Sequence, residues 1–348
     1  MRAVVNAARD PARVPQPSRD ALAFHRGLVG YEPTPLRELP ELAADTGVAA
    51  VLLKDESNRL GLPAFKVLGA SWAIERTLQS GTDVRELVAA SAGNHGRAVA
   101  HVAAGRGLRC RIFLPRATAP ARRLAIETEG ADVVLVDGVY EEAVARAEEA
   151  ARTPGVILVA DVGSSPQAYW VIDGYATLFA EAADRGVFDL VLVPAGVGSL
   201  AAAAARHAAA LGMHAVAVEP VTAPCVTASL AAGAPTTVAT PGTSMAGLDC
   251  AEVSVAAWPS LYAGLTGGVT VSDPEVHEEM RALARAGLAI GDCGAASAAA
   301  LRVLAREPKA AELRREVGFG SGTRVLLIAT EGPTNPDGYR HVTASAVP

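Results

Sequence analysis

Short runs of aliphatic and β-branched residues alternate with alanine-rich stretches along nearly the whole chain. The runs are continuously apolar, which is typical of parallel strands that are buried on both faces. Strands that alternate with helices predict an α/β fold with parallel sheets. The predicted strands are Ala50–Lys54, Leu87–Ala90, Cys110–Leu114, Val133–Val136, Val156–Ala160, Leu190–Pro194, His214–Val218 and Val325–Ala329. The predicted helices between them include Arg97–Gly105, Ala119–Glu129 and Tyr140–Arg152. Residues 1–20, which contain three prolines, are expected to form an irregular arm.

The composition excludes several classes of protein. Half of the 348 residues are apolar and the net charge is −6 without a basic block, which disfavours binding to nucleic acid. No apolar run approaches the roughly 20 residues that a membrane span needs, and no signal peptide is evident, so we expect a cytoplasmic protein. The four cysteines lack a CxxC pair and the seven histidines lack zinc-site spacing, which predicts free thiols and no metal site.

Lysine is rare in this chain, and one lysine has an unusual setting. Only three of the 31 basic residues are lysines, and Lys66 is flanked by apolar residues on both sides. Pro63 is predicted as the first position of a helix that continues through Ile74. A helix start and partial desolvation both favour a neutral amine, which is a nucleophile that forms Schiff bases with carbonyls. From this local pattern alone, a lysine whose amine reaches solvent remains an equal alternative.

Three loops follow predicted strands, at the edge where open parallel sheets bind ligands. Residues 91–96 (SAGNHG) precede a helix whose free N–H groups suit a carboxylate, although an ordinary capped turn fits equally well. Residues 195–200 (AGVGSL) suit one phosphate group but match neither nucleotide-binding glycine motif. Residues 330–334 (TEGPT) place a hydroxyl at a strand end, as an ordinary turn would too.

In their order and spacing, these segments and several others resemble the fold-type II pyridoxal-phosphate enzymes, which share the tryptophan synthase β fold. Within that group the chain is most similar to the diaminopropionate ammonia-lyases. The resemblance spans residues 25–342 and rests on residues 31–36 (YEPTPL), 54–62 (KDESNRLGL), 64–69 (AFKVLG), 93–97 (GNHGR), 174–178 (GYATL), 195–198 (AGVG), 218–220 (VEP), 245–248 (MAGL) and 330–332 (TEG).

The resemblance implies two α/β domains with mostly parallel sheets and pyridoxal 5'-phosphate between them. The large cofactor-binding domain would comprise residues 1–74 and 179–348, and the small domain residues 75–178. A homodimer is implied as well. The implied cofactor-binding residues are Phe65, Lys66, Asn94, Gly196, Val197, Gly198, Ser199, Leu200 and Thr330. The implied substrate-binding residues are Ser91, Ala92, Gly93, Asn94 and His95, and the implied catalytic residues are Lys66 and Asp161.

Thr330 carries the prediction of reaction type. The resemblance places its hydroxyl at the pyridine nitrogen, where a neutral group keeps the ring from becoming a deep electron sink, so a β-leaving group departs promptly. We therefore expect α,β-elimination on a small L-amino acid similar to 2,3-diaminopropionate, giving an α-keto acid and ammonia, with Lys66 as the base. The alternatives are an L-serine or L-threonine dehydratase, a β-replacement synthase, and a non-catalytic homologue that binds cofactor or amino acid. The intact Lys66 argues against the last.

The chain also departs from the pattern of its closest family. Diaminopropionate ammonia-lyases that accept both enantiomers carry an aspartate where this chain has Ala92, so a second base for D-substrates is missing. Asp161 matches a second active-site aspartate only with a gap in the alignment, and it could instead cap the turn after its strand. Pro333 and Asn335 replace two further acidic residues. These departures leave the native substrate open.

Overall fold

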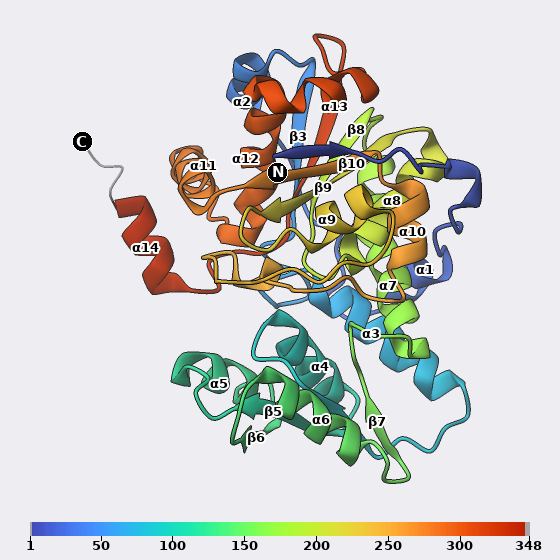
Figure 1. The fold of residues 1–348 in the computed structure, drawn as a ribbon. Helices are drawn as coiled ribbons and strands as arrows, with labels where there is room; N and C mark the ends of the chain where they lie inside the picture. Colours follow the sequence, from blue (N-terminus) through green and yellow to red (C-terminus); the bar gives the residue numbers. More distant parts are fainter. Residues whose placement is uncertain (1, 345–348) are drawn as a thin grey trace.

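The structure is a computed structural model that describes residues 2–344, and its strands form two separate sheets (Figure 1). The strands are β1 (Ala3–Val5), β2 (Leu36–Glu38), β3 (Ala50–Asp55), β4 (Glu86–Ala89), β5 (Arg109–Pro115), β6 (Asp132–Val136), β7 (Val156–Leu158), β8 (Leu190–Pro194), β9 (His214–Pro220), β10 (Gly267–Val271) and β11 (Arg324–Ala329). The larger sheet has the order β1-β10-β9-β8-β11-β3-β2, and the smaller has the order β6-β5-β4-β7.

Helices cover both faces of each sheet. They are α1 (Asp20–Arg26), α2 (Pro40–Thr46), α3 (Lys66–Gln79), α4 (Asn94–Gly105), α5 (Pro120–Glu127), α6 (Tyr140–Ala150), α7 (Pro166–Ala183), α8 (Ser199–Leu211), α9 (Cys225–Ala232), α10 (Trp258–Gly264), α11 (Asp273–Arg285), α12 (Asp292–Arg306), α13 (Ala311–Glu316) and α14 (Pro336–Ala344). Short 3-10 turns lie at Pro11–Arg13, Ala246–Leu248 and Pro308–Ala310.

The larger sheet is apolar on both faces, as its continuous apolar strands predict. Along β8, Val191 and Val193 pack with α7 and α8, whereas Leu190 and Leu192 face the opposite way and pack with α11 and α12. Each such side chain contributes about 1.5–3 kcal/mol when it is fully buried. All contacts among β10, β9, β8, β11 and β3 are parallel, and only the edge strands β1 and β2 pair antiparallel. The prediction of mostly parallel sheets is confirmed.

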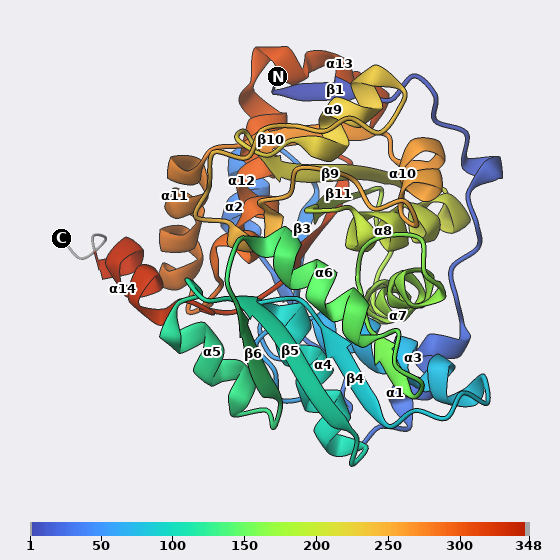
Figure 2. The ribbon, with the colours of Figure 1, turned by 60° about the horizontal axis from the view of Figure 1, so that its bottom comes forward.

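The smaller sheet is entirely parallel and has α4 on one face and α6 on the other. Figure 2 shows this sheet and its helices as a separate layer in front of the larger one. Helices α3 and α7 run between the two layers and pack on each other. The predicted domain limits, after residues 74 and 178, fall inside these two helices and stay a prediction.

Two glycines allow α3 and α7 to cross closely. A Cβ on Gly174 would lie 2.5 Å from the Leu68 carbonyl oxygen, and a Cβ on Gly69 would lie 2.5 Å from the Tyr175 ring. Only a residue without a Cβ fits such an approach. The crossing therefore places Tyr175 against the first turn of α3, which carries Lys66.

Two local predictions are wrong. Residues 1–20 are not wholly irregular, because β1 pairs with β10 and a 3-10 turn lies at Pro11–Arg13. Helix α3 begins at Lys66 and not at Pro63, because the backbone at Pro63 is used elsewhere: its carbonyl accepts a hydrogen bond from the Gly332 amide at 3.0 Å. Lys66 still occupies the first turn of a helix, as predicted.

Within residues 2–344, none of the helices has the length and apolarity needed to cross a membrane. The four cysteines are free thiols, and the described part of the chain contains no cluster of residues suited to a metal ion.

Candidate active site

The ends of five parallel strands define the site. Strands β3, β11 and β8 are neighbours in the larger sheet, and β4 and β7 are neighbours in the smaller one. The carboxyl ends of neighbouring parallel strands lie at the same edge of a sheet, where α/β proteins bind their ligands. The loops after these strands and the first turns of the helices that follow contain every residue that the sequence assigns to the site, and contacts between them join the two layers seen in Figures 1 and 2.

Lys66 lies where the two layers meet. Its Nζ is 2.8 Å from Oδ2 of Asp161, which follows β7, and 5.8 Å from the centre of the Tyr175 ring. Phe65, directly before the helix, packs edge-on against Tyr175 with 4.7 Å between ring centres. The lysine side chain is 23% exposed.

The expectation of a neutral Lys66 amine is wrong for this state of the protein. Burial lowers the pKa of Lys66, but the charge of Asp161, the hydrogen bond to it and the nearby Tyr175 and Cys250 together outweigh burial, and the net pKa is raised. Burial in turn raises the pKa of Asp161, but His95 and Lys66 lower it by more, and the net pKa is well below the usual value. The pair is therefore an ammonium and a carboxylate. The helix start and the apolar flanks of Lys66 are evident in the sequence, but its contact with a carboxylate is not.

His95 ties the loop after β4 to the loop after β7. Its Nε2 donates to the Val159 carbonyl at 2.8 Å, and its Nδ1 lies 3.8 Å from Asp161. The imidazole is buried. The Nδ1 atom has no hydrogen-bond partner within residues 2–344, and the predicted role of His95 in binding the substrate stays a prediction.

Asn94 begins α4 and reaches across to the larger sheet. Its Nδ2 donates to Oε2 of Glu331 at 2.5 Å, directly after Thr330 at the end of β11. Thr330 is buried, and its Oγ1 has no hydrogen-bond partner within residues 2–344. A buried hydroxyl without a partner costs free energy, so Thr330 suits a ligand atom that can hydrogen-bond to it, such as a pyridine nitrogen.

The loop after β8 is shaped for an anion. Gly198 adopts φ +95° and caps α8, so the amides of the first turn point out of the helix as a phosphate site requires. A Cβ on Gly196 would lie 2.8 Å from the Gly247 carbonyl oxygen and 2.9 Å from Sγ of Cys250. Ser199 donates its hydroxyl to the Asp161 carbonyl at 3.0 Å, so this proton is not free for a phosphate.

The remaining loop residues are arranged around Asn94. Gly93 donates its amide to Oγ of Ser91 at 3.3 Å, and a Cβ on Gly96 would clash with the Ser91 carbonyl at 2.1 Å. This tight turn exposes Gly93 and leaves Ser91 and Ala92 partly exposed at the start of α4. Ala92 brings no charge to the site.

A buried ionic network supports the segment that leads to Lys66. Lys54 at the end of β3 pairs with Glu181 at 2.5 Å, and Arg59 pairs with Glu181 at 2.8 Å and with Glu56 at 2.6 Å. All four side chains are almost fully buried. Buried charges of this kind are tolerated only when they are paired, so the network fixes the loop after β3 against α7.

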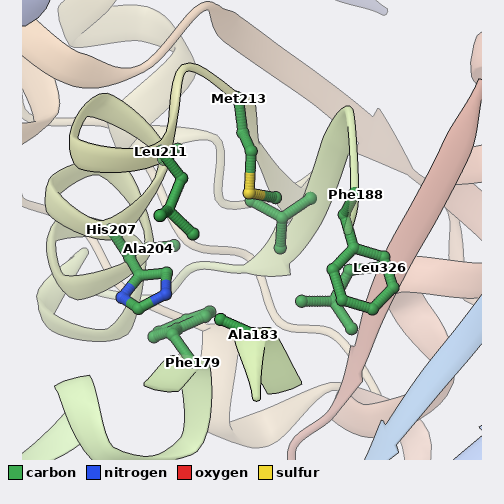
Figure 3. A pocket seen from close by; sticks show the side chains of 10 residues that line it. Phe179, Ala183, Phe188, Ala204, His207, Leu211, Met213 and Leu326 are labelled. Carbon is green, nitrogen blue, oxygen red and sulfur yellow. The ribbon is translucent and has the colours of Figure 1, made fainter. Parts of the chain in front are cut away.

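A small apolar cavity of about 10 Å³ lies away from the site, between α7 and α8 (Figure 3). His207 borders it, and neither ring nitrogen has a partner within residues 2–344. Burial lowers the pKa of His207 to about 4, so the ring is neutral near pH 7. The cavity has room for about one water molecule and offers no reactive group.

The residues predicted for the site fit the cofactor that the resemblance implies. The loop at Gly196–Gly198 suits its phosphate, Thr330 its ring nitrogen, and Lys66 its aldehyde. Two contributions were missed from the sequence, namely the packing of Tyr175 against Lys66 and the hydrogen bond that Asn94 donates to Glu331. Both residues lie in the quoted motifs, but their partners are 109 and 237 positions away, where periodicity carries no information.

The comparisons with known proteins agree with this site. The family of pyridoxal-phosphate dependent enzymes matches residues 28–331. Diaminopropionate ammonia-lyase of Escherichia coli strain K12 is 32% identical over 357 residues, covering 92% of this chain and 90% of the relative. L-threonine dehydratase of Corynebacterium glutamicum is 31% identical over 218 residues, covering 60% of this chain and 48% of the relative.

Among solved structures, E. coli diaminopropionate ammonia lyase in complex with an aminoacrylate–PLP azomethine intermediate aligns with a TM-score of 0.89. The sequence identity is 29%, and the alignment covers 99% of this chain and 96% of that one. With the matched family spanning most of the chain, and Lys66 and its surroundings formed as described, this chain belongs to the pyridoxal-phosphate dependent enzymes of fold type II, and its cofactor is pyridoxal 5'-phosphate.

Proposed function

We propose that this enzyme eliminates ammonia from L-2,3-diaminopropionate, giving pyruvate and a second ammonia after hydrolysis. The observation that carries the proposal is the pair of Lys66 and Asp161, 2.8 Å apart where the two layers meet. It is supported by the similarity to diaminopropionate ammonia-lyase over 92% of the chain, and by the capture of an aminoacrylate in the E. coli structure. Pyridoxal phosphate held at this site would supply an electron-withdrawing ring that makes the proton at Cα of the substrate more acidic.

Lys66 has two roles in this proposal. It holds the cofactor in the resting enzyme, and when the substrate amine replaces it, the free amine removes the proton from Cα. The proton taken up by Lys66 makes an ammonium, which Asp161 stabilises at the distance seen here. The proton is then available to the β-amine as that group leaves.

The other residues bind and orient. We place the phosphate at the loop and first turn that begin α8, namely Gly196, Val197, Gly198, Ser199 and Leu200, of which the last two lie in the helix. Thr330 receives the ring nitrogen, Phe65 packs beside it and Asn94 meets the phenolic oxygen. The substrate carboxylate lies at the start of α4, where Ser91, Ala92, Gly93, Asn94 and His95 form the turn and free amides favour an anion.

A dehydratase is the second candidate function. The residues 91–95 (SAGNH) include Ala92 in place of a carboxylate, which resembles a serine or threonine dehydratase, and the similarity to L-threonine dehydratase covers 60% of the chain. Without a carboxylate at residue 92, one group that could attract a β-ammonium is missing. A β-replacement synthase would differ from both in its product. It would form a new amino acid when a thiol or amine is added, and it would release no keto acid.

The attachment of the cofactor is tested by visible absorbance. The wild-type protein incubated with pyridoxal phosphate and then desalted is expected to be yellow, and Lys66→Ala is expected to lose the band that depends on the lysine imine. Lys309→Ala is the matched control, because Lys309 is exposed and lies in a 3-10 turn outside the site. A colourless wild type, or a Lys66→Ala variant that keeps the wild-type band, would overturn the assignment.

We also propose that the enzyme is a cytoplasmic homodimer. The proposal rests on the resemblance to the family and on the mixed-charge composition of the sequence. Light scattering coupled to size exclusion measures the assembly directly, and a monomer of 35.5 kDa would contradict the dimer.

A further inference from the structure

The backbone of Glu331 is held between two parts of the site. It forms an isolated antiparallel bridge with Ala64, two residues before Lys66. On the other side its carbonyl accepts the amide of Gly291 at 3.1 Å, directly before α12. A Cβ on Gly294 would lie 2.8 Å from the same carbonyl oxygen, which shows how closely α12 approaches. The side chain therefore starts from a fixed position.

From there, the carboxyl group of Glu331 extends to the other layer. It is 7% exposed, and its Oε2 accepts from Nδ2 of Asn94 at 2.5 Å. Burial raises its pKa, and the charge of Asp292 raises it further, while the bonds from Cys293 and Asn94 oppose the shift. This bond thus joins the loop that follows β11 to the first residue of α4.

The bond decides which end of the Asn94 amide faces which way. A carboxyl oxygen that accepts from Asn94 must face the nitrogen and not the oxygen of the carboxamide. The nitrogen carries two N–H groups, so one remains after the first is donated to Glu331. The Asn94 carboxamide can donate to the phenolic oxygen of the cofactor only if its nitrogen faces the site. If its carbonyl oxygen faced the site instead, the two oxygens would repel each other.

We propose that Glu331 is a positioning residue that orients the Asn94 carboxamide so that its second N–H donates to the phenolic oxygen of the cofactor. The inference rests on the role proposed for Asn94 above. Donation to that oxygen stabilises negative charge on it. When the donor is lost, the phenolic oxygen holds its negative charge less easily. The protonated imine of Lys66 then loses its proton less readily, and the pH midpoint of the visible band moves upward.

The test is a pH titration of the visible absorbance of the desalted holoenzyme in five proteins: wild type, Glu331→Ala, Glu331→Gln, Asn94→Ala and the double variant Glu331→Ala with Asn94→Ala. We expect Glu331→Ala to raise the midpoint by about one pH unit, the shift that one ordinary hydrogen bond produces. Glu331→Gln keeps an acceptor at the same reach, so its midpoint should stay closer to that of the wild type than to that of the alanine variant. The double variant Glu331→Ala with Asn94→Ala should shift no further than Asn94→Ala alone.

Three results would overturn the proposal, and they are distinguishable. If Asn94→Ala shifts the midpoint but Glu331→Ala titrates like the wild type, Asn94 contacts the cofactor without help from Glu331. If Asn94→Ala itself leaves the midpoint unchanged, the role proposed for Asn94 fails, and the inference about Glu331 fails with it. Equal shifts in Glu331→Gln and Glu331→Ala would show that the charge of Glu331 matters and not its acceptor.

Discussion

At the scale of single residues, the reactivity of Lys66 depends on its neighbour. Burial alone would favour a neutral amine, but Asp161 at 2.8 Å raises the pKa of the lysine. An amine paired in this way takes up a proton readily and holds it, which suits a base whose protonated form must persist until the leaving group departs. Asp161 thus stabilises the protonated form of Lys66, which is the form that exists after the proton has been removed from Cα.

Asp161→Asn is predicted to lower kcat/KM for elimination by about 100-fold, because the amide keeps the shape but cannot stabilise the lysine ammonium. Keto-acid release is measured for both proteins at several pH values. The visible band of the bound cofactor serves as the control, since loss of cofactor would also abolish activity. Unchanged kcat/KM in a variant that retains the band would contradict a catalytic role for Asp161.

Ala92 predicts the stereochemical preference. With no carboxylate at this position, we expect the L-enantiomer of diaminopropionate to react at least about 100-fold faster than the D-enantiomer. Ala92→Asp should raise turnover of the D-enantiomer relative to the L-enantiomer, because it adds a second base. Comparable rates for both enantiomers in the wild type would refute this reading of Ala92.

At the scale of elements, the crossing of α3 and α7 sets the position of Lys66. Tyr175 and Phe65 pack against the lysine only because Gly69 and Gly174 let the helix axes come close. His25 from α1 strengthens the same junction, with Nδ1 2.7 Å from Oγ1 of Thr177 and Nε2 3.0 Å from the Leu68 carbonyl. Three helices thus hold one end of the site.

Gly174→Ala is predicted to lower the free energy of unfolding by about 2–3 kcal/mol, because the added Cβ would overlap the Leu68 carbonyl. Gly105→Ala is the matched control. Gly105 also lies in a helix, but nothing lies within 4 Å of its Cβ position and its φ is not positive. Urea denaturation compares both with the wild type, and equal stability of the two variants would show that the crossing tolerates a methyl group.

His25 predicts a dependence of stability on pH. Burial lowers its pKa from 6.5 to about 4. As the pH falls through this interval the unfolded chain takes up a proton that the folded chain refuses, so stability present above pH 6.5 is lost by up to about 3 kcal/mol. The wild type should lose more stability between pH 7 and pH 4.5 than His25→Asn does, as measured by urea denaturation. Equal losses would mean that other groups cause the acid sensitivity.

At the scale of the whole molecule, continuous apolar strands made most of the fold predictable. Eight of the strands, β3 to β9 and β11, coincide with predicted runs to within about two residues at most ends. The exceptions have physical reasons. Strands β1 and β2 lie at sheet edges and have three residues each, which is too short a run to be distinguished as a strand from the sequence.

Strand β10 was missed because it begins with two glycines, which normally mark turns. Here a Cβ on Gly267 would lie 2.1 Å from the Val4 carbonyl oxygen, and one on Gly268 would lie 2.4 Å from Oγ1 of Thr227. The glycines are needed for close packing of neighbours that the local sequence does not reveal. The same limit applies to the site: Lys66 and Thr330 follow from motifs, but the contact of Lys66 with Asp161 spans 95 positions and required the fold.

Elimination from L-2,3-diaminopropionate with Lys66 as the base has a fixed stoichiometry of products, which can be measured directly. The holoenzyme is incubated with this amino acid, and pyruvate and ammonia are measured together. We predict two molecules of ammonia for each pyruvate in the wild type and in Lys309→Ala, and no product in Lys66→Ala. Release of pyruvate from L-serine with one ammonia, but none from L-2,3-diaminopropionate, would contradict the account and identify a dehydratase.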